Sequence, residues 1–207
     1  MKLTQDFYDR DTRVVARDLL GKYLVRIEED GLPLVVRLCE TEAYIGRLDK
    51  ACHAYNYRRT ARTETLFAPP GTAYIYFIYG MYYCLNCVTE AQGEPCAVLL
   101  RGGQPRGNVE ALAWNRYHKS LAELSRYQRK NFLNGPGKLC KALGLTKREN
   151  GTSLLEDRFF LCDRLEDIGL TTPPEDLLPF SVRTGPRVGI DYAQAAVHFP
   201  WRYLIAP

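Results

Sequence analysis

Short runs of alternating apolar and polar residues dominate the first part of this chain, and they predict strands. Lys22 to Glu28 and Leu34 to Tyr44 have the two-residue period of half-buried strands, on either side of a turn at Glu29-Asp30-Gly31. Arg13 to Leu20 has helical spacing instead, and Gly21 marks its C-terminal end. A helix followed by two paired strands is therefore expected to open the fold.

An aromatic hairpin is predicted in the middle of the chain. Ala73 to Tyr79 and Tyr82 to Val88 are rich in β-branched and aromatic residues, and Gly80-Met81 joins them. Cys96 to Arg101 predicts a further strand, whereas Ile45 to Ala68 is polar and irregular.

Helical spacing returns in Asn108 to Lys130, and Gly135 to Leu143 predicts a short helix. The remainder predicts short strands and loops, ending with Trp201 to Ile205. These elements predict an α+β fold: a single mixed domain over residues 1–207, with a curved, mainly antiparallel sheet, a protruding hairpin and surrounding helices.

The composition excludes several classes of protein. Hydrophobic residues make up 46% and charged residues 25% of the 207 residues, which is ordinary for a globular domain. The apolar runs have strand length, so we expect no membrane span. The first six residues lack the apolar segment of a secretory signal, so we expect a cytoplasmic protein, in the bacterial nucleoid, or a nuclear one if eukaryotic.

The seven cysteines are scattered, and we expect them to be small buried hydrophobes in a reducing compartment. Cys84 and Cys87 form one C-x-x-C pair, but it lies in a predicted strand without a second pair or a nearby histidine. The histidines, His53, His118 and His198, also lack metal-ligand spacing. We therefore expect no metal site.

Charge is distributed unevenly along the chain. Residues 101–148 contain 11 Lys and Arg against 2 Asp and Glu, a formal charge of +9, and residues 149–180 contain 2 against 8, a formal charge of −6. A basic block of this size suits a polyanion. A solvated helical face, partly offset by the acidic block beside it, is an equally good explanation of the charge alone.

Two carboxylates stand at the end of an apolar strand face. By the alternation, Leu34, Val36 and Leu38 share a face with Glu40, Glu42 and Tyr44. A partly buried glutamate has a raised pKa, which suits a general base. The alternative is a strand that leaves the core at Glu40, with both carboxylates solvated.

Tyr79 is predicted at the tip of the hairpin, next to Gly80, where a core tyrosine does not belong. An aromatic residue on a rigid turn could wedge into a stack of bases, while Tyr74 and Tyr76, on one face of the strand, could stack on an extruded base. The alternative is a tyrosine-rich core strand, which for Tyr74 is the better interpretation.

The segment Asn134-Gly135-Pro136-Gly137-Lys138-Leu139 departs from the P-loop pattern. Backbone N–H groups at Gly135 and Gly137, together with Lys138, are candidates for contacts with a DNA phosphate. A plain helix start is the alternative.

Ordered blocks over nearly the whole chain resemble the alkyladenine (3-methyladenine) DNA glycosylase family. The blocks are Phe7-Tyr8, Leu19-Leu20-Gly21, Val35 to Tyr44, Ala51 to Ala54, Phe67 to Asn86, Val98 to Arg101, Asn134 to Leu143 and Gly185 to Ile190. The resemblance implies a monofunctional enzyme that flips a damaged purine out of duplex DNA and hydrolyses its bond to deoxyribose, without a metal or an organic cofactor. The implied partner is double-stranded DNA containing damaged purines, and we expect a monomer.

The resemblance also implies catalytic roles. Glu42 would be the general base that deprotonates a water for attack on the sugar C1′. Arg101 and the backbone carbonyl of Val188 would help to hold that water. Glu40 would then be a supporting acid.

Binding roles follow from the same resemblance. Tyr79 would intercalate where the lesion left the duplex. Tyr44, His53 and Tyr76 would sandwich the flipped base, and Asn86 would narrow the pocket against the exocyclic amine of guanine. Two competing hypotheses are a DNA-binding module that senses damage without cleaving, which the presence of Glu42 disfavours, and a hydrolase of free nucleosides, which the basic block and the tip tyrosine disfavour.

Overall fold

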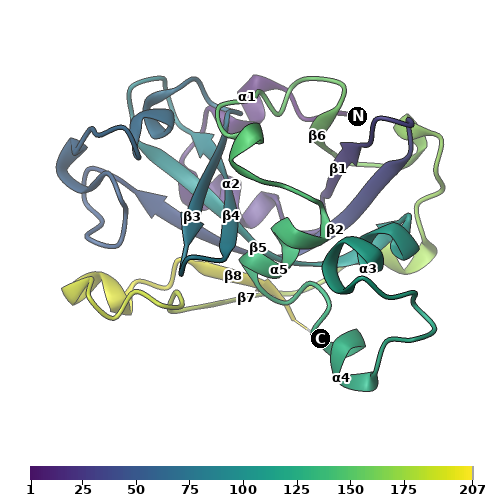
Figure 1. The fold of residues 1–207 in the computed structure, drawn as a ribbon. Coiled ribbons are helices and arrows are strands. Elements are labelled where there is room, and N and C mark those ends of the chain that lie inside the picture. The colour runs from purple at the N-terminus through teal and green to yellow at the C-terminus, as the bar shows by residue number, and fades with distance from the viewer. Residues whose placement is uncertain (207) are drawn as a thin grey trace.

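The computed structural model describes residues 1–206 and shows a curved sheet with helices around it (Figure 1). The strands are β1 (Tyr23–Ile27), β2 (Pro33–Ile45), β3 (Ala73–Ile78), β4 (Tyr82–Thr89), β5 (Cys96–Gly107), β6 (Phe159–Cys162), β7 (Val182–Gly185) and β8 (Arg202–Ile205). The helices are α1 (Gln5–Tyr8), α2 (Thr12–Asp18), α3 (Val109–Tyr117), α4 (Arg126–Lys130) and α5 (Pro136–Ala142).

All strand pairs of the sheet are antiparallel. The strand order is β3-β4-β5-β2-β1-β6, and β8 pairs with both β2 and β7. The predicted α+β fold is therefore confirmed, including the β3–β4 hairpin.

The long strand β2 organises the sheet. One of its edges pairs with β5 along most of its length, while the other edge pairs first with β1 and then, from Glu40 to Glu42, with β8. At the point of change the pairing with β5 moves from Leu38↔Gly103 to Glu40↔Gly102, which leaves Cys39 as a bulged residue. A bulge re-aims the side chains that follow it, and the two carboxylates of β2 come directly after this one.

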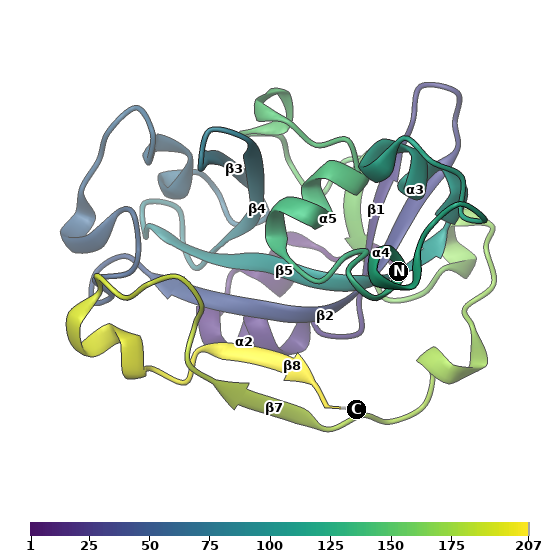
Figure 2. The same cartoon turned by 60° about the horizontal axis from the view of Figure 1, so that its bottom comes forward.

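Helices cover the sheet from two sides. In Figure 2, α5 lies above β5 and α2 lies below it, and α3 packs against α5. Thr41 of β2 donates its hydroxyl to the Ala16 carbonyl of α2 at 2.6 Å. Because neighbouring residues of a strand point to opposite faces, Glu42 faces away from α2.

The prediction of one helix over 108–130 is wrong. Helix α3 ends at Tyr117 because His118 has a left-handed backbone conformation (φ 54°) and its N–H bonds back to the Trp114 carbonyl. A separate helix, α4, starts after Ser125, which forms a capping box with Gln128. That S-x-x-Q pattern is visible in the sequence. Strand β5 is also longer than predicted, because β2 pairs with it as far as Gly107.

The seven cysteines are all free thiols, and six of them are buried. Their predicted role as small buried hydrophobes is confirmed except for Cys39, which is half-buried at the bulge. Within residues 1–206, no three His, Cys, Asp or Glu side chains gather as metal ligands. The longest helix, α3, has nine residues, so no helix in the described part of the chain could cross a bilayer.

Candidate active site

A cavity of about 660 Å³ opens on one face of the sheet. Glu42 of β2 pairs with Leu99 of β5, and Leu99 in turn pairs with Asn86 of β4. Tyr74 of β3 stands opposite Asn86. Because directly paired residues project from the same face, four strands place one transverse row of side chains at this cavity. Its volume is typical of pockets that enclose a small ligand.

The predicted site residues converge on this cavity. Ten of the eleven line it: Tyr44, His53, Tyr76, Tyr79, Asn86, Arg101, Gly135, Gly137, Lys138 and Val188. The eleventh, Glu42, is fully buried and hydrogen-bonds to two of the lining residues. The structure therefore brings together residues that are up to 146 positions apart in the chain.

Glu42 is held by neutral and cationic donors. Its Oε2 accepts the Tyr44 hydroxyl at 2.8 Å, and its Oε1 accepts the Val188 N–H at 2.9 Å. The Arg101 guanidinium lies 3.5 Å from Oε1. Burial nevertheless raises the pKa of Glu42 above its ordinary value of 4.5, because desolvation of the carboxylate outweighs these partners. Each oxygen retains a lone pair for one more donor.

Glu40 contacts the same cation. Arg101 Nε donates to Glu40 Oε1 at 2.7 Å, and Arg202 Nε donates to the same oxygen at 2.6 Å. The predicted shared face of Glu40 and Glu42 is therefore confirmed. The alternative, in which both carboxylates are solvated, is wrong, because Glu42 has no exposed surface.

A buried ion pair, between Asp49 and Arg187, supports the residues that bind Glu42. The side chains of Asp49 and Arg187 are both 0% exposed, and they form two hydrogen bonds, one of them from Arg187 Nη2 at 2.7 Å. Arg187 also donates to the Ala43 carbonyl at 2.8 Å, and its guanidinium lies 4.6 Å from the centre of the Tyr44 ring. Because Val188 follows Arg187 directly, this pair positions the N–H that binds Glu42. Neither partner is among the site residues predicted from the sequence.

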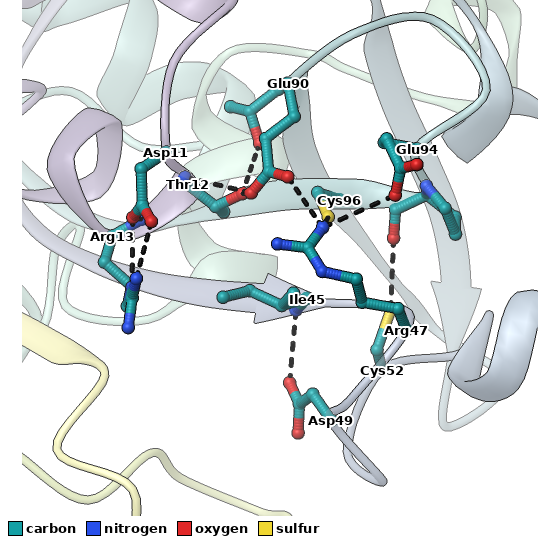
Figure 3. Close-up of polar contacts among 12 residues, drawn as sticks. Asp11, Thr12, Arg13, Ile45, Arg47, Asp49, Cys52, Glu90, Glu94 and Cys96 are labelled. Atoms are coloured by element: carbon teal, nitrogen blue, oxygen red, sulfur yellow. Dashed lines mark hydrogen bonds and ion pairs between the residues drawn. The ribbon is translucent and has the colours of Figure 1, made fainter.

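The segment that carries Asp49 is anchored on its other side by Arg47 (Figure 3). Arg47 donates to Glu90 at 2.8 Å and approaches Glu94 at 3.4 Å, both in the connection between β4 and β5. The hydroxyl of Thr12, at the start of α2, donates to Glu90 at 2.6 Å. The irregular segment after β2 is thus fixed by charged contacts rather than by regular secondary structure.

Aromatic rings form one wall of the cavity. The ring centres of His53 and Tyr76 are 4.6 Å apart, and those of Tyr74 and Tyr76 are 5.5 Å apart. His53 Nδ1 lies 3.0 Å from the Tyr74 hydroxyl, and Arg62 lies 3.4 Å from His53 Nε2. Burial, with a smaller effect of Arg62, lowers the pKa of His53 to about 4, so the imidazole is neutral near pH 7. Tyr74 is only 3% exposed, which confirms its core position.

Asn86 lines the cavity next to this aromatic wall, opposite Tyr74 in the sheet. It is 4% exposed, and its amide nitrogen donates to the Tyr74 carbonyl at 3.0 Å. This bond fixes the side-chain amide in one orientation.

The hairpin tip projects beside the cavity. Tyr79 (φ 54°) and Gly80 (φ 67°) both have positive φ, and the Met81 N–H bonds to the Ile78 carbonyl, as in a type I′ turn. Tyr79 is 76% exposed, and a Cβ atom on Gly189 would lie 3.9 Å from its hydroxyl. The tip therefore faces the loop that carries Val188.

Helix α5 closes the cavity on the hairpin side. A Cβ atom on Gly137 would lie 2.8 Å from Tyr82, so this glycine lets α5 approach the hairpin. Lys138 Nζ donates to the Asn134 side chain at 2.7 Å and reaches the cavity. The predicted backbone-phosphate contacts of Gly135, Gly137 and Lys138 stay predictions.

The acidic block does not neutralise the basic block. Within residues 1–206, one ion pair joins the two blocks, between Asp176 and Arg106. The other ion pairs of the acidic block are made with the first 37 residues: Asp157 with Lys2, Asp163 with Lys22, Glu149 with Arg26, Asp176 with Arg37, and Asp167 with the N-terminal amine. The offset that sequence-adjacent charges suggested is therefore largely absent, because the acids pair elsewhere in the fold.

Comparison with known proteins identifies the same family over the whole chain. Residues 6–207 match the family described as methylpurine-DNA glycosylase (MPG). Two proteins named "Putative 3-methyladenine DNA glycosylase", from Clostridium perfringens strains SM101 and 13, are 48% and 49% identical to this chain over 205 residues. A protein of the same name from Clostridium botulinum strain Loch Maree is 46% identical over 207 residues. Each alignment covers 99% of this chain and 96% of the relative.

The buried ion pair generates a stability prediction. Asp49→Asn keeps the shape of the side chain but leaves the Arg187 charge buried and unpaired, so the free energy of unfolding should fall by about 3–5 kcal/mol. Urea unfolding followed by circular dichroism measures this loss. The matched control is Glu64→Gln, which breaks the exposed pair between Arg59 and Glu64 and should leave the unfolding midpoint unchanged. Equal effects of the two substitutions would contradict the role of the buried pair.

Proposed function

This chain belongs to the methylpurine-DNA glycosylase family of N-glycosidic bond hydrolases, and on that premise we propose that it releases alkylated or deaminated purines from duplex DNA. The proposed substrates are of the 3-methyladenine, 7-methylguanine, hypoxanthine and ethenoadenine class. The product is an abasic site, and the enzyme does not cut the strand.

The environment of Glu42 carries this proposal. A carboxylate without exposed surface, behind a cavity of base-enclosing size, retains lone pairs and has a raised pKa. A base whose pKa lies closer to neutrality accepts a proton more readily in the transition state than an ordinary glutamate does. A damage sensor without catalytic activity would gain nothing from burying this charge.

The reaction needs one water. Glu42 accepts a proton from it, the water oxygen forms a bond with C1′ of the deoxyribose, and the bond between C1′ and the purine nitrogen breaks, with its electron pair leaving on the base. Arg101, whose Nε is bound by Glu40, has terminal N–H groups left to orient the water. The Val188 carbonyl is the proposed second contact of this water. Electron-poor purines leave most readily, so damaged bases are cleaved before normal ones.

The aromatic wall is the proposed base-binding surface. Tyr44 would lie on one side of the flipped purine, with His53 and Tyr76 on the other. The neutral state of His53 suits an electron-poor or cationic alkylated base, because an imidazolium would repel it. Asn86, with its amide held by the Tyr74 carbonyl, would oppose the exocyclic amine of guanine.

Tyr79 is the proposed wedge in the duplex. Its exposed ring stands on a tight turn next to the cavity, so it could fill the gap left by the flipped nucleotide. A hydrolase of free nucleosides would have no use for such a ring outside the pocket.

No covalent intermediate with the enzyme is proposed. Lys138, the lysine among the residues that line the cavity, is engaged by the side chain of Asn134. The water activated by Glu42 is sufficient for hydrolysis, so the proposed reaction requires neither a Schiff base nor a metal or organic cofactor.

Substitution of Glu42 by Gln tests the base. Under single-turnover conditions with methylated DNA and with hypoxanthine-containing duplexes, Glu42→Gln should lower the rate of base release by about 100-fold or more, while duplex affinity stays close to that of the wild type. Borohydride should trap no covalent adduct with either protein. Loss of duplex affinity together with release would mean that Glu42 is structural, and wild-type binding without release of any base would support a sensor.

The raised pKa of Glu42 predicts the acid limb of the pH profile. The carboxylate must be deprotonated to act, so the rate of release should fall as the pH drops through the Glu42 pKa, with a midpoint above 4.5. Single-turnover rates on duplex substrate, corrected for release without enzyme, measure this midpoint. A midpoint at or below 4.5 would argue against a buried base.

Substitution of Tyr79 tests whether its aromatic ring, rather than the turn that carries it, contributes to DNA binding. Tyr79→Asn removes the ring but creates Asn-Gly, the sequence that type I′ turns prefer because asparagine tolerates positive φ. Affinity for a lesion-containing duplex should fall at least about fivefold, as expected for one lost stacking contact. Tyr79→Phe is the control and should retain most of the affinity. Equal affinity of Tyr79→Asn and the wild type would exclude the wedge.

A further inference from the structure

A second cavity, of about 500 Å³, adjoins the proposed base pocket. The two cavities share Cys52, His53 and Tyr192 as lining residues. The other residues around the second cavity are Lys50, Tyr55, Arg58, Thr60, Arg62 and Thr63. Three cations and two threonines therefore surround a space that shares three lining residues with the base pocket.

None of the three cations has a carboxylate partner within residues 1–206. Lys50 donates to the Gln194 side-chain oxygen, and Arg62 contacts His53 Nε2 at 3.4 Å. Arg58 makes no side-chain hydrogen bond or ion pair with the described residues. The nearest acid in sequence, Asp49, is fully engaged by Arg187. The cavity thus holds positive charge that the described protein does not balance.

Arg59, the neighbour of Arg58 in the same loop, does have a carboxylate partner. It pairs with Glu64 through two hydrogen bonds, at 2.9 and 2.6 Å, and its guanidinium lies 4.8 Å from the centre of the Phe67 ring. Arg59 does not line the second cavity. Of two adjacent arginines, one is neutralised by a carboxylate, and the other is left for an external anion.

The chemistry of the second cavity differs from that of the base pocket. Guanidinium and ammonium donors with threonine hydroxyls are the groups that bind phosphate oxygens, whereas the base pocket is lined mostly by apolar and aromatic residues. Arg62 connects the two, since its guanidinium lies 5.5 Å from the centre of the Tyr76 ring. An anion bound by Arg58 and Lys50 would sit directly next to whatever occupies the base pocket.

We propose that the second cavity binds a phosphodiester of the DNA strand that carries the flipped nucleotide, immediately beside that nucleotide. This inference rests on the proposed function, because a flipped nucleotide delivers its flanking phosphate to the rim of the base pocket. Lys138 of the basic block lines the base pocket, which shares His53 with the second cavity. The strand would therefore contact cations in both cavities.

The test is the salt dependence of duplex binding by Lys50→Ala/Arg58→Ala. The probe is a duplex with a tetrahydrofuran abasic analogue, and its affinity is measured by fluorescence anisotropy between about 50 and 200 mM salt. Loss of one phosphate contact should make the slope of log K against log salt shallower by about 1, so the double variant, which removes two cations from the same phosphate, should differ from the wild type by about 1. Both substituted residues are exposed, so folding should be unaffected.

Arg59→Ala is the matched control, since it removes a cation of the same loop that already has a partner. Its slope should match that of the wild type. Single methylphosphonate linkages, placed in turn around the abasic analogue, then locate the phosphate. At one flanking position the neutral linkage should weaken binding by the wild type but not by the double variant.

A double variant with the same slope as Arg59→Ala would overturn the proposal. A second result would also overturn it: inorganic phosphate competes with the duplex at constant ionic strength, but no methylphosphonate position weakens binding by the wild type and spares the double variant. The cavity would then bind free anions rather than the strand. Base release by the wild type is measured separately. A protein that shows the slopes expected here but releases no base contradicts the proposed reaction and leaves the phosphate site standing.

Discussion

The buried ion pair between Asp49 and Arg187 is the interaction on which the candidate site depends. It joins the irregular segment after β2 to the loop before Val188, which are 138 residues apart in sequence. It also places a cation over the Tyr44 ring, 4.6 Å from the ring centre. Since Tyr44 and Val188 are the two hydrogen-bond donors of Glu42, one pair fixes the orientation of the carboxylate through both of its oxygens.

The two carboxylates near this pair, Glu40 and Glu42, have different environments. Glu40 accepts hydrogen bonds from two arginines on one oxygen, and so helps to orient Arg101. Glu42 has no exposed surface, and the desolvation of its carboxylate raises its pKa above 4.5. Two carboxylates on one strand face thus have different surroundings, one bound by two arginines and the other without exposed surface. Fixed dipoles and charges of this kind need little rearrangement when a reaction develops charge.

Local patterns were sufficient for part of this picture. The two-residue period placed Glu40 and Glu42 on one face, and the hairpin signal at Gly80 placed Tyr79 at a turn; both positions are confirmed. Resemblance to a family supplied Arg101, His53 and Asn86, which no local pattern marks. Asp49 and Arg187 were missed because a buried pair between distant segments leaves no periodic trace. The break at His118 was missed because a left-handed conformation in a non-glycine residue follows from capping, not from hydrophobic spacing.

The change of neighbour along β2, from β1 to β8, has a consequence for how the chain acquires its chemistry. Glu40 meets Arg202 across a sequence separation of 162, and Glu42 meets Val188 across 146. Contacts of such high order form late, after the local hairpins. On the ribosome, most of the sheet can assemble while Glu42 still faces water as an ordinary acid. The Glu42 carboxylate gains its Val188 partner only when the last segment docks, so the candidate site is the part of the fold that is completed last.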